Sequence, residues 1–265
     1  MIHALCPKCG HAPLPENQAA PAACPVCGAI LAKAGVLVRR RPTGMTVAQP
    51  EAPGREAGLG AGAVFLHLPD TVARSVWVAR LATLAACCLW TAWIWHGIDV
   101  RAGEAGSFVL WAVLTPFHEA GHVLLVWAPE FMSILGGTLG QHLMPLVLAG
   151  ALLIRRRDPF GAALFVWLFG YSLIMMAVYM YDAFDPRIML LDGRTGADSD
   201  GHDWQNMFGD LGLLRNARGI GLFFAWAGRW VMLASLGWAG CIVWMQRARL
   251  PDNPLAETHS SVNAP

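Results

Sequence analysis

The chain has 265 residues, of which 55% are hydrophobic and only 14% are charged. About a quarter of the residues in a soluble domain are charged, so this composition excludes an ordinary soluble protein and predicts an integral membrane protein with a smaller polar part. The formal net charge of +1, with no long basic run, argues against a nucleic-acid partner.

Residues 1–41 carry four cysteines in two matching Cys-Pro-x-Cys-Gly turns, which begin at Cys6 and Cys24. One such turn brings two thiolates to a metal, and two turns together form a closed tetrahedral site. The pair of turns resembles a zinc ribbon. We therefore predict a small N-terminal β domain that needs a structural Zn²⁺ to fold, held by Cys6, Cys9, Cys24 and Cys27. The alternative is a set of unrelated reduced thiols.

The first residues lack the apolar stretch of a signal peptide, and paired cysteines that bind a metal suit a reducing compartment. We therefore expect a cytoplasmic ribbon on a protein of the bacterial inner membrane. In that position the ribbon would bind a protein partner or present substrates.

Residues 42–72 are rich in Pro, Gly and Ala and show no helical or strand period, which predicts a flexible linker. Residues 73–246 form the predicted membrane domain, and residues 247–265 form a polar tail that we expect to be disordered. The apolar segments predicted to enter the membrane are 76–98, 107–128, 131–154, 160–181 and 219–245.

Segment 131–154 is interrupted by Gly136-Gly137, Gly140 and Pro145, so it is either a span or a re-entrant hairpin. Arginine clusters mark the cytoplasmic side of a membrane. Five full spans would leave the last two clusters outside, whereas a hairpin at 131–154 brings every cluster inside. We therefore predict an all-α polytopic bundle of four to five transmembrane helices with a re-entrant hairpin. The clusters are Arg74 with Arg80, residues 155–157, and Arg247 with Arg249.

The second apolar segment contains the run His118-Glu119-Ala120-Gly121-His122. Two His at positions i and i+4 stand on one helix face and can bind one Zn²⁺, and the Glu between them can act as general base on a zinc-bound water. Ionisable groups at membrane depth are costly and indicate a functional site. The alternative is a histidine pair that is hydrogen-bonded inside a helical bundle.

A hydrolytic zinc site needs three protein ligands. The only Glu residues after His122 are Glu130, which is too close in sequence, and Glu257, which lies in the tail. An Asp or a His must therefore complete the site. We rank the adjacent pair His202 and Asp203 first, with one residue binding zinc and the other orienting it. The alternatives are Asp182, Asp192 and His142.

From 76 to 246 the chain resembles membrane-embedded zinc metalloproteases of the site-2 protease type. In that family the His pair and a later Asp of a Leu-Asp-Gly motif bind zinc, and the Glu is catalytic. The resemblance implies that His118 and His122 are ligands and that Glu119 is the base. Leu191-Asp192-Gly193 matches the third motif by its letters. The arrangement is also similar to a divergent bacterial branch with a His-Asp-Trp motif, which His202 to Trp204 match.

These patterns predict an intramembrane or membrane-interface zinc endopeptidase with one catalytic and one structural zinc. Its substrate would be a membrane protein or a peptide, and its surroundings the lipid bilayer. One alternative is a metal-dependent enzyme of another class, such as an oxidase, although such enzymes need more histidines than the membrane half offers. Another is a non-proteolytic metal-binding scaffold whose ribbon binds partners. Glu119 favours an enzyme, because metal binding alone does not require it.

Overall fold

The computed structural model describes residues 5, 6, 11, 12, 14, 16, 22–27, 30, 31 and 61–251. The chain divides into two compact units, Met1–Ala57 and Gly58–Pro265, which we describe separately. In the first unit, Cys6, Cys24 and Leu31 are buried in one small cluster. Ala23 and Ile30 form an antiparallel bridge. Cys9 and most of the predicted linker and tail lie outside the described residues.

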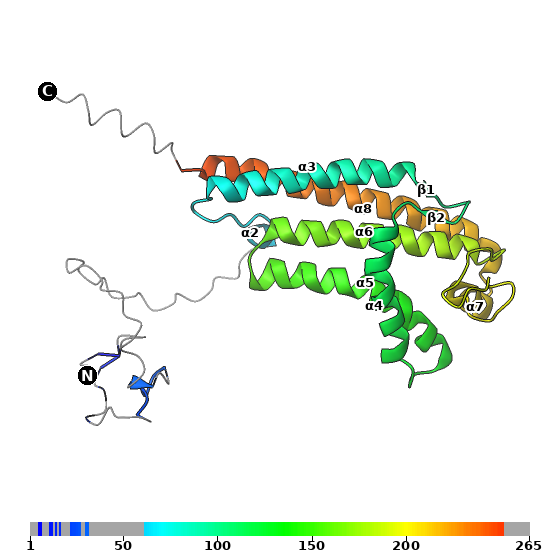
Figure 1. The fold of residues 1–265 in the computed structure, drawn as a ribbon, viewed down its shortest axis with the longest axis horizontal. Coiled ribbons are helices and arrows are strands. Elements are labelled where there is room, and N and C mark those ends of the chain that lie inside the picture. The colour runs from blue at the N-terminus through cyan, green and yellow to red at the C-terminus, as the bar shows by residue number, and fades with distance from the viewer. Residues whose placement is uncertain are drawn as a thin grey trace. The chain divides into compact units, whose positions relative to one another are not determined.

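The second unit is a helical bundle (Figure 1). Four of its described helices are long and apolar enough to cross a membrane, which agrees with the expected membrane bundle. The long helices are α3 (Arg74–His96), α5 (Glu130–Arg155), α6 (Pro159–Asp182) and α8 (Ala217–Gln246). The short ones are α2 (Ala61–Phe65), α4 (Phe108–Leu124) and α7 (Asp203–Asp210), with 3₁₀ turns at Leu214–Asn216 and Arg247–Arg249.

A two-stranded antiparallel hairpin joins α3 to α4. Its strands are β1 (Ile98–Asp99) and β2 (Glu104–Ala105), and Ile98 lies opposite Ala105. Helix α2 falls within the stretch predicted as linker. Its last residue is held against the bundle, because the Trp238 indole donates a hydrogen bond to the Phe65 carbonyl at 2.9 Å.

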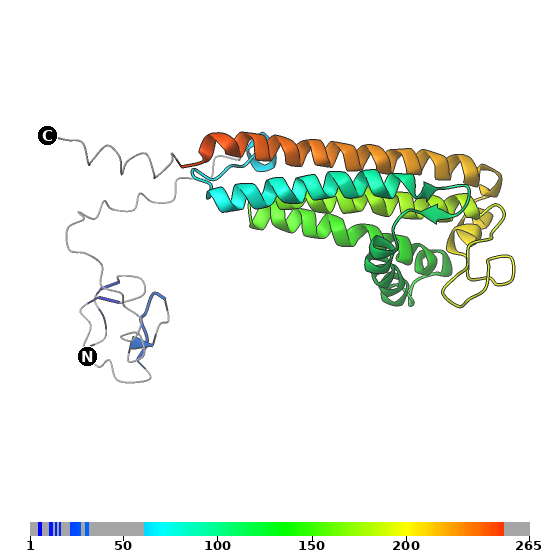
Figure 2. The same ribbon diagram turned by 45° about the horizontal axis from the view of Figure 1, so that its top comes forward.

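Helix α6 forms the centre of the bundle. It is apolar on all sides, as expected for a helix buried by its neighbours, and it packs between α5 and α8 (Figure 2). Tyr171, Ile174 and Ala177 along its length have no exposed surface. The Tyr171 hydroxyl donates a hydrogen bond to the carbonyl of Ser107, the residue that caps α4, at 2.9 Å. The central helix thereby fixes where α4 begins.

The predicted re-entrant hairpin at 131–154 is wrong, because α5 is a single helix that continues through Pro145. The predicted second span, 107–128, is not among the four described helices that are long and apolar enough to cross a membrane. Helix α4 has 17 residues, about 25 Å, and a bilayer core is about 30 Å thick. It also runs across the long helices instead of along them (Figure 1, Figure 2).

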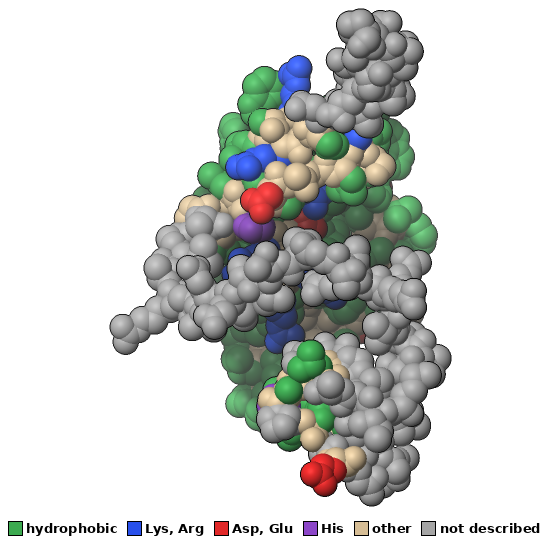
Figure 3. All heavy atoms as spheres, turned by 90° about the vertical axis from the view of Figure 1, so that its left-hand side faces the viewer, with side chains coloured by type: hydrophobic (Ala, Val, Ile, Leu, Met, Phe, Trp, Pro, Cys, Tyr) green, Lys and Arg blue, Asp and Glu red, His purple; other side chains and the backbone are tan. Residues whose placement is uncertain are grey.

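All the arginine clusters nevertheless lie at one end of the bundle, as the topology argument required. Arg80 at the start of α3 forms an ion pair of 2.9 Å with Asp158, which precedes α6. The Val72 amide donates to the Arg249 carbonyl at 2.9 Å. Figure 3 looks onto this end and shows basic side chains standing among apolar ones. The loop that contains α7 lies at the opposite end (Figure 1).

Glycines bring α4 close to α5. A Cβ placed on Gly121 would overlap the carbonyl oxygen of Gly136, and a Cβ on Gly140 would overlap the carbonyl oxygen of Phe117. The glycines that suggested a broken segment are thus contact points of a continuous helix. Small residues permit this close backbone approach, which drives helix association in membranes.

Gly121→Ala should destabilise the bundle, because its methyl group would meet the Gly136 backbone. Overpacking against backbone costs up to about 3 kcal/mol and outweighs the gain in helix propensity of about 1 kcal/mol. The net loss of about 2 kcal/mol should lower the melting temperature in detergent by about 4–8 °C. Gly150→Ala is the matched control, since nothing lies within 4 Å of a Cβ there. Equal melting temperatures for the two variants would contradict the close contact.

Candidate metal centre

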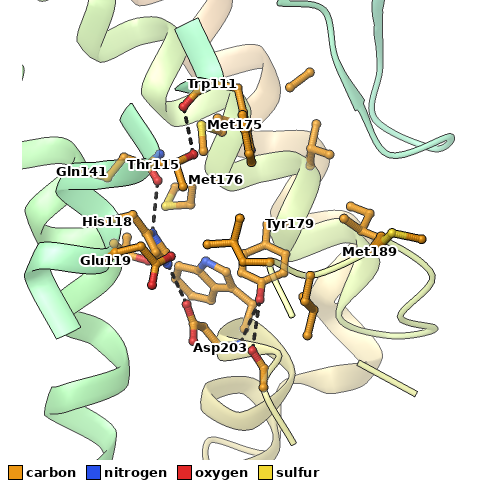
Figure 4. Close-up of a pocket in the computed structure, with 18 of the residues that line it drawn as sticks. Trp111, Thr115, His118, Glu119, Gln141, Met175, Met176, Tyr179, Met189 and Asp203 are labelled. Carbon is orange, nitrogen blue, oxygen red and sulfur yellow. Dashed lines mark hydrogen bonds and ion pairs between the residues drawn. The ribbon is translucent and has the colours of Figure 1, made fainter. Parts of the chain in front are cut away.

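Three side chains from distant parts of the sequence converge at one point. His118 and His122 lie one turn apart on α4, and Asp203 is the first residue of α7. Asp203 Oδ2 lies 2.9 Å from His118 Nε2 and 3.3 Å from His122 Nε2. One ligand atom from each residue falls within 4.8 Å of the other two. Figure 4 shows Asp203 reaching towards His118 from the α7 side.

The second nitrogen of each imidazole is held by an oxygen acceptor. His118 Nδ1 lies 3.2 Å from Gln141 Oε1, and His122 Nδ1 lies 2.9 Å from the Ser133 carbonyl. Gln141 is itself fixed, because its amide donates to both the carbonyl and the hydroxyl of Ser172 at 3.1 and 3.0 Å. An oxygen acceptor requires Nδ1 to carry the proton, so it is Nε2 of each imidazole that a metal ion would bind.

This set of atoms fits a metal ion. Two neutral imidazole nitrogens and a carboxylate oxygen match a catalytic zinc site with one position left for substrate. Gly137 on α5 lies directly against the site. A Cβ there would come within 2.7 Å of His118 Nε2 and still closer to His122 Nε2. Any residue other than glycine at 137 would therefore occupy the space between the two histidines.

His202, the other half of the predicted pair, does not face this site. Its side chain is fully buried and lies against the Tyr179 ring, with ring centres 4.1 Å apart. Its Nδ1 accepts from the Gln205 amide at 3.1 Å, and its Nε2 lies 3.3 Å from Asp182 Oδ2. Both ring nitrogens are therefore occupied. His202 caps the start of α7 and orients its neighbour Asp203.

Asp182 anchors the polar loop rather than joining the three converging residues. Besides His202, its carboxylate accepts hydrogen bonds from the amides of Arg187 and Ile188 at 2.9 and 3.1 Å. The end of α6 is thus tied to both ends of the loop that leads to α7. This arrangement explains why a carboxylate is tolerated at the end of an apolar helix.

The remaining alternatives, Asp192 and His142, are also separate from the group. Asp192 accepts hydrogen bonds from the backbone amide and the side chain of Arg194, and these bonds lower its pKa. His142 Nδ1 lies 2.8 Å from the Thr138 carbonyl, and its ring packs edge-on against Phe169. Asp192 does lie on the wall of the cleft beside the site.

That cleft has a volume of about 460 Å³ and opens beside the converging residues. Glu119, between the two histidines, is exposed and lines it (Figure 4). Most of the remaining wall is apolar. The apolar lining includes Trp111, Met175, Met176, Ile188, Met189 and Leu190.

Asp203 and His122 shift each other's pKa. The hydrogen bond to Asp203 raises the pKa of His122 to about 9, against the opposing effect of burial. Burial works to raise the pKa of Asp203, but hydrogen bonds from His118 and His122 outweigh it and lower that pKa. Without a metal, the cluster therefore holds a proton that a cation would displace.

Among the described residues, a second group of metal-ligand type lies in the first unit. Cys6, Cys24 and Cys27 have sulfur atoms within 4.8 Å of one another, and the Cys6 and Cys27 sulfurs are 3.7 Å apart. Such an arrangement of thiols could hold one metal ion. The fourth predicted ligand, Cys9, lies outside the described residues.

No protein-family model, curated protein or solved structure matches this chain.

The sequence reasoning missed the residues of α5 that support the site. Ser133, Gly137 and Gln141 recur every four residues, which places them on one helix face. Within an apolar segment, that spacing of small and polar residues could have indicated a face that meets the histidines. It was overlooked because the neighbouring glycines suggested a break in the helix.

Asp203→Ala should remove one metal ion, because it deletes one of three ligands. We expect zinc in the purified protein to fall from about two to about one per chain, the remainder being the ribbon ion. Asp192→Ala is the matched control and should keep about two. Atomic absorption of dialysed protein measures both. The same zinc loss in both variants, or in Asp192→Ala alone, would overturn the assignment of Asp203.

Zinc uptake at this centre should strengthen with rising pH. Below a pKa of about 9, His122 holds a proton that the metal must displace. Apparent affinity should therefore rise about tenfold per pH unit between about pH 7 and 9, and then level off. Competition with a chromophoric chelator measures this, after subtraction of the ribbon contribution given by Asp203→Ala. An affinity that does not change over this range would show that His122 carries no such proton.

Proposed function

We propose that this protein is a zinc-dependent endopeptidase of the membrane, with His118, His122 and Asp203 as zinc ligands and Glu119 as general base. One observation carries the proposal. Two histidines and a carboxylate converge where a glutamate lines a largely apolar cleft. Metal storage or a structural metal would not require an accessible glutamate beside an open coordination position.

The residues around the metal centre would have different roles in the reaction. When bound, zinc would polarise the scissile carbonyl and make water more acidic. Glu119 would take the proton from the attacking water and return it to the leaving amine. Gln141 and the Ser133 carbonyl would keep both imidazoles in the tautomer that ligates through Nε2. His202 and Tyr179 would hold the start of α7, so that Asp203 stays on the metal.

The volume and the apolar lining of the cleft favour a polypeptide substrate. Its volume of about 460 Å³ lies within the usual range for ligand sites. Apolar walls would bind apolar side chains, and they would also restrict bulk water around the reacting bond. The side chains of Met175, Met176 and Met189 in that lining are flexible, which suits a site that accepts several apolar residues.

The ribbon belongs to the same proposal as a structural element. Cys6, Cys9, Cys24 and Cys27 would hold a second zinc in a closed site, which leaves no position for substrate. Its role would be to bind a protein partner. This second zinc is the reason to expect about two metal ions per chain.

Glu119→Gln should abolish peptide hydrolysis without removing zinc. The amide has similar shape but cannot take a proton, so turnover should fall by about 10²–10⁴. The assay uses quenched fluorescent peptides with apolar residues, added to protein in proteoliposomes, with products identified by mass spectrometry. Glu130→Gln, an exposed glutamate at the start of α5, is the control.

The outcomes separate the competing functions. Wild-type hydrolysis that survives in Glu119→Gln would refute the general-base mechanism. Zinc binding at the centre without hydrolysis of any peptide, in the wild type as well, would favour a metal-binding scaffold. Loss of zinc in Glu119→Gln would mean that Glu119 supports the metal site instead of the reaction.

A further inference from the structure

The outer side of α4 is apolar and has no partner within the described residues of the second unit. One side of this helix packs against α5 through Gly121. On the outer side only Glu119 is charged, and it lines the cleft. A helix surrounded by water would carry charged residues on its outer face. The exposed apolar side chains are Phe108, Val109, Val113, Phe117, Val123 and Leu124, followed by Val126 and Trp127.

Contacts between the long helices give the level of the metal centre along the bundle. Gln141 on α5 is hydrogen-bonded to Ser172 on α6. The two helices run in opposite directions, so Gly137 and Met176, each one turn closer to the α7 end of the bundle, lie at the same level. Gly221 on α8 packs against Ala177 and Tyr181. With a rise of 1.5 Å per residue along α8, the level of Gly137 and Met176 corresponds to about residue 224. The metal centre lies against Gly137 and is therefore at this level.

Exposed tryptophans lie near both ends of α8, as Trp side chains do where a helix meets the two surfaces of a membrane. Trp226 and Trp230 are 60% and 66% exposed near one end, and Trp244 is 71% exposed near the other. Arg247 lies over the Trp244 ring, as expected for an anchor at a membrane surface. Trp226 and Trp244 are about 27 Å apart along the helix, close to the thickness of a bilayer core of about 30 Å.

The metal centre therefore lies about 3 Å beyond the level of Trp226, at the edge of the lipid. An independent observation agrees. Helix α3 ends at His96, and the hairpin that follows supplies Gly103 and Ala105 to the wall of the cleft. The polar loop supplies Asp192 and Gly201. The cleft thus begins where α3 stops.

We propose that α4 is an interfacial helix, which lies in the plane of the membrane with its outer apolar side in contact with lipid at the headgroup boundary. A short apolar helix that crosses the spans at the level of an aromatic belt has this geometry. The lipid would cover the apolar side of α4, and the helix would present its histidines at the membrane surface, at the end opposite the arginine clusters.

A substrate class follows, and this part rests on the proposed endopeptidase function. The centre would act on peptide bonds next to the membrane surface, in polypeptides whose membrane anchor brings the bond to that level. Bonds in the middle of a transmembrane helix would lie about 15 Å away, half the thickness of the core. Such bonds would not reach Glu119.

Depth-dependent fluorescence quenching tests the position of α4 without any assay of activity. A dansyl-bearing amino acid is placed at Phe117 or Leu124 in the full chain, which is reconstituted in phosphatidylcholine vesicles. The vesicles contain lipid with a nitroxide either near the headgroup or near the chain end. We expect the shallow nitroxide to quench both positions at least twofold more strongly than the deep one.

Two exposed positions serve as matched controls. Leu89 on α3 is 74% exposed and lies near mid-span, so the deep nitroxide should quench it more strongly. Leu211, after α7, is 55% exposed and should be quenched by neither.

Stronger deep quenching at Phe117 and Leu124 would overturn the proposal, because α4 would then enter the bilayer core. No quenching there would also overturn it, because water or protein would cover the helix. Glu119→Gln should leave the quenching unchanged, so this test can fail or succeed independently of catalysis.

Discussion

The close contact between α4 and α5 is the constraint on which the site depends. Gly121, Gly136 and Gly140 let the two backbones approach until no side chain fits between them. Only at that separation can Gln141 and the Ser133 carbonyl reach the two imidazoles. Gly137 leaves the remaining space in front of the histidines empty. A contact made by small residues thus creates both the support of the histidines and room for a cation.

The histidine motif and the general class of fold could be predicted from the sequence, because both depend on local pattern. Two His at i and i+4 share a helix face in any context, and long apolar segments indicate membrane helices. The path of the chain could not be predicted in the same way. The arginine clusters favoured one apolar segment that does not cross, and the glycines before Pro145 drew that assignment to 131–154. In the structure α5 is a continuous helix, and α4 is the short apolar one. Whether a glycine breaks a helix or contacts another one depends on tertiary packing.

The choice between His202 and Asp203 shows a similar limit. The two residues are adjacent, so the rotation of α7 about its axis decides which one faces α4. In the structure His202 is buried on Tyr179 and bonded to Asp182, which turns the Asp203 carboxylate outwards to His118 and His122. Those partners come from the end of α6, about twenty residues earlier in the chain. The sequence alone could therefore place His202 and Asp203 near the site, but it could not show which of the two faces the histidines.

The most direct test of the central claim is an anomalous scattering map, measured at the zinc edge from crystals of the zinc-loaded protein. We expect a peak at about 2.0–2.2 Å from His118 Nε2, His122 Nε2 and an Asp203 carboxylate oxygen. A peak bound by His202 or Asp192, or the absence of any peak among His118, His122 and Asp203 in zinc-loaded crystals, would contradict it.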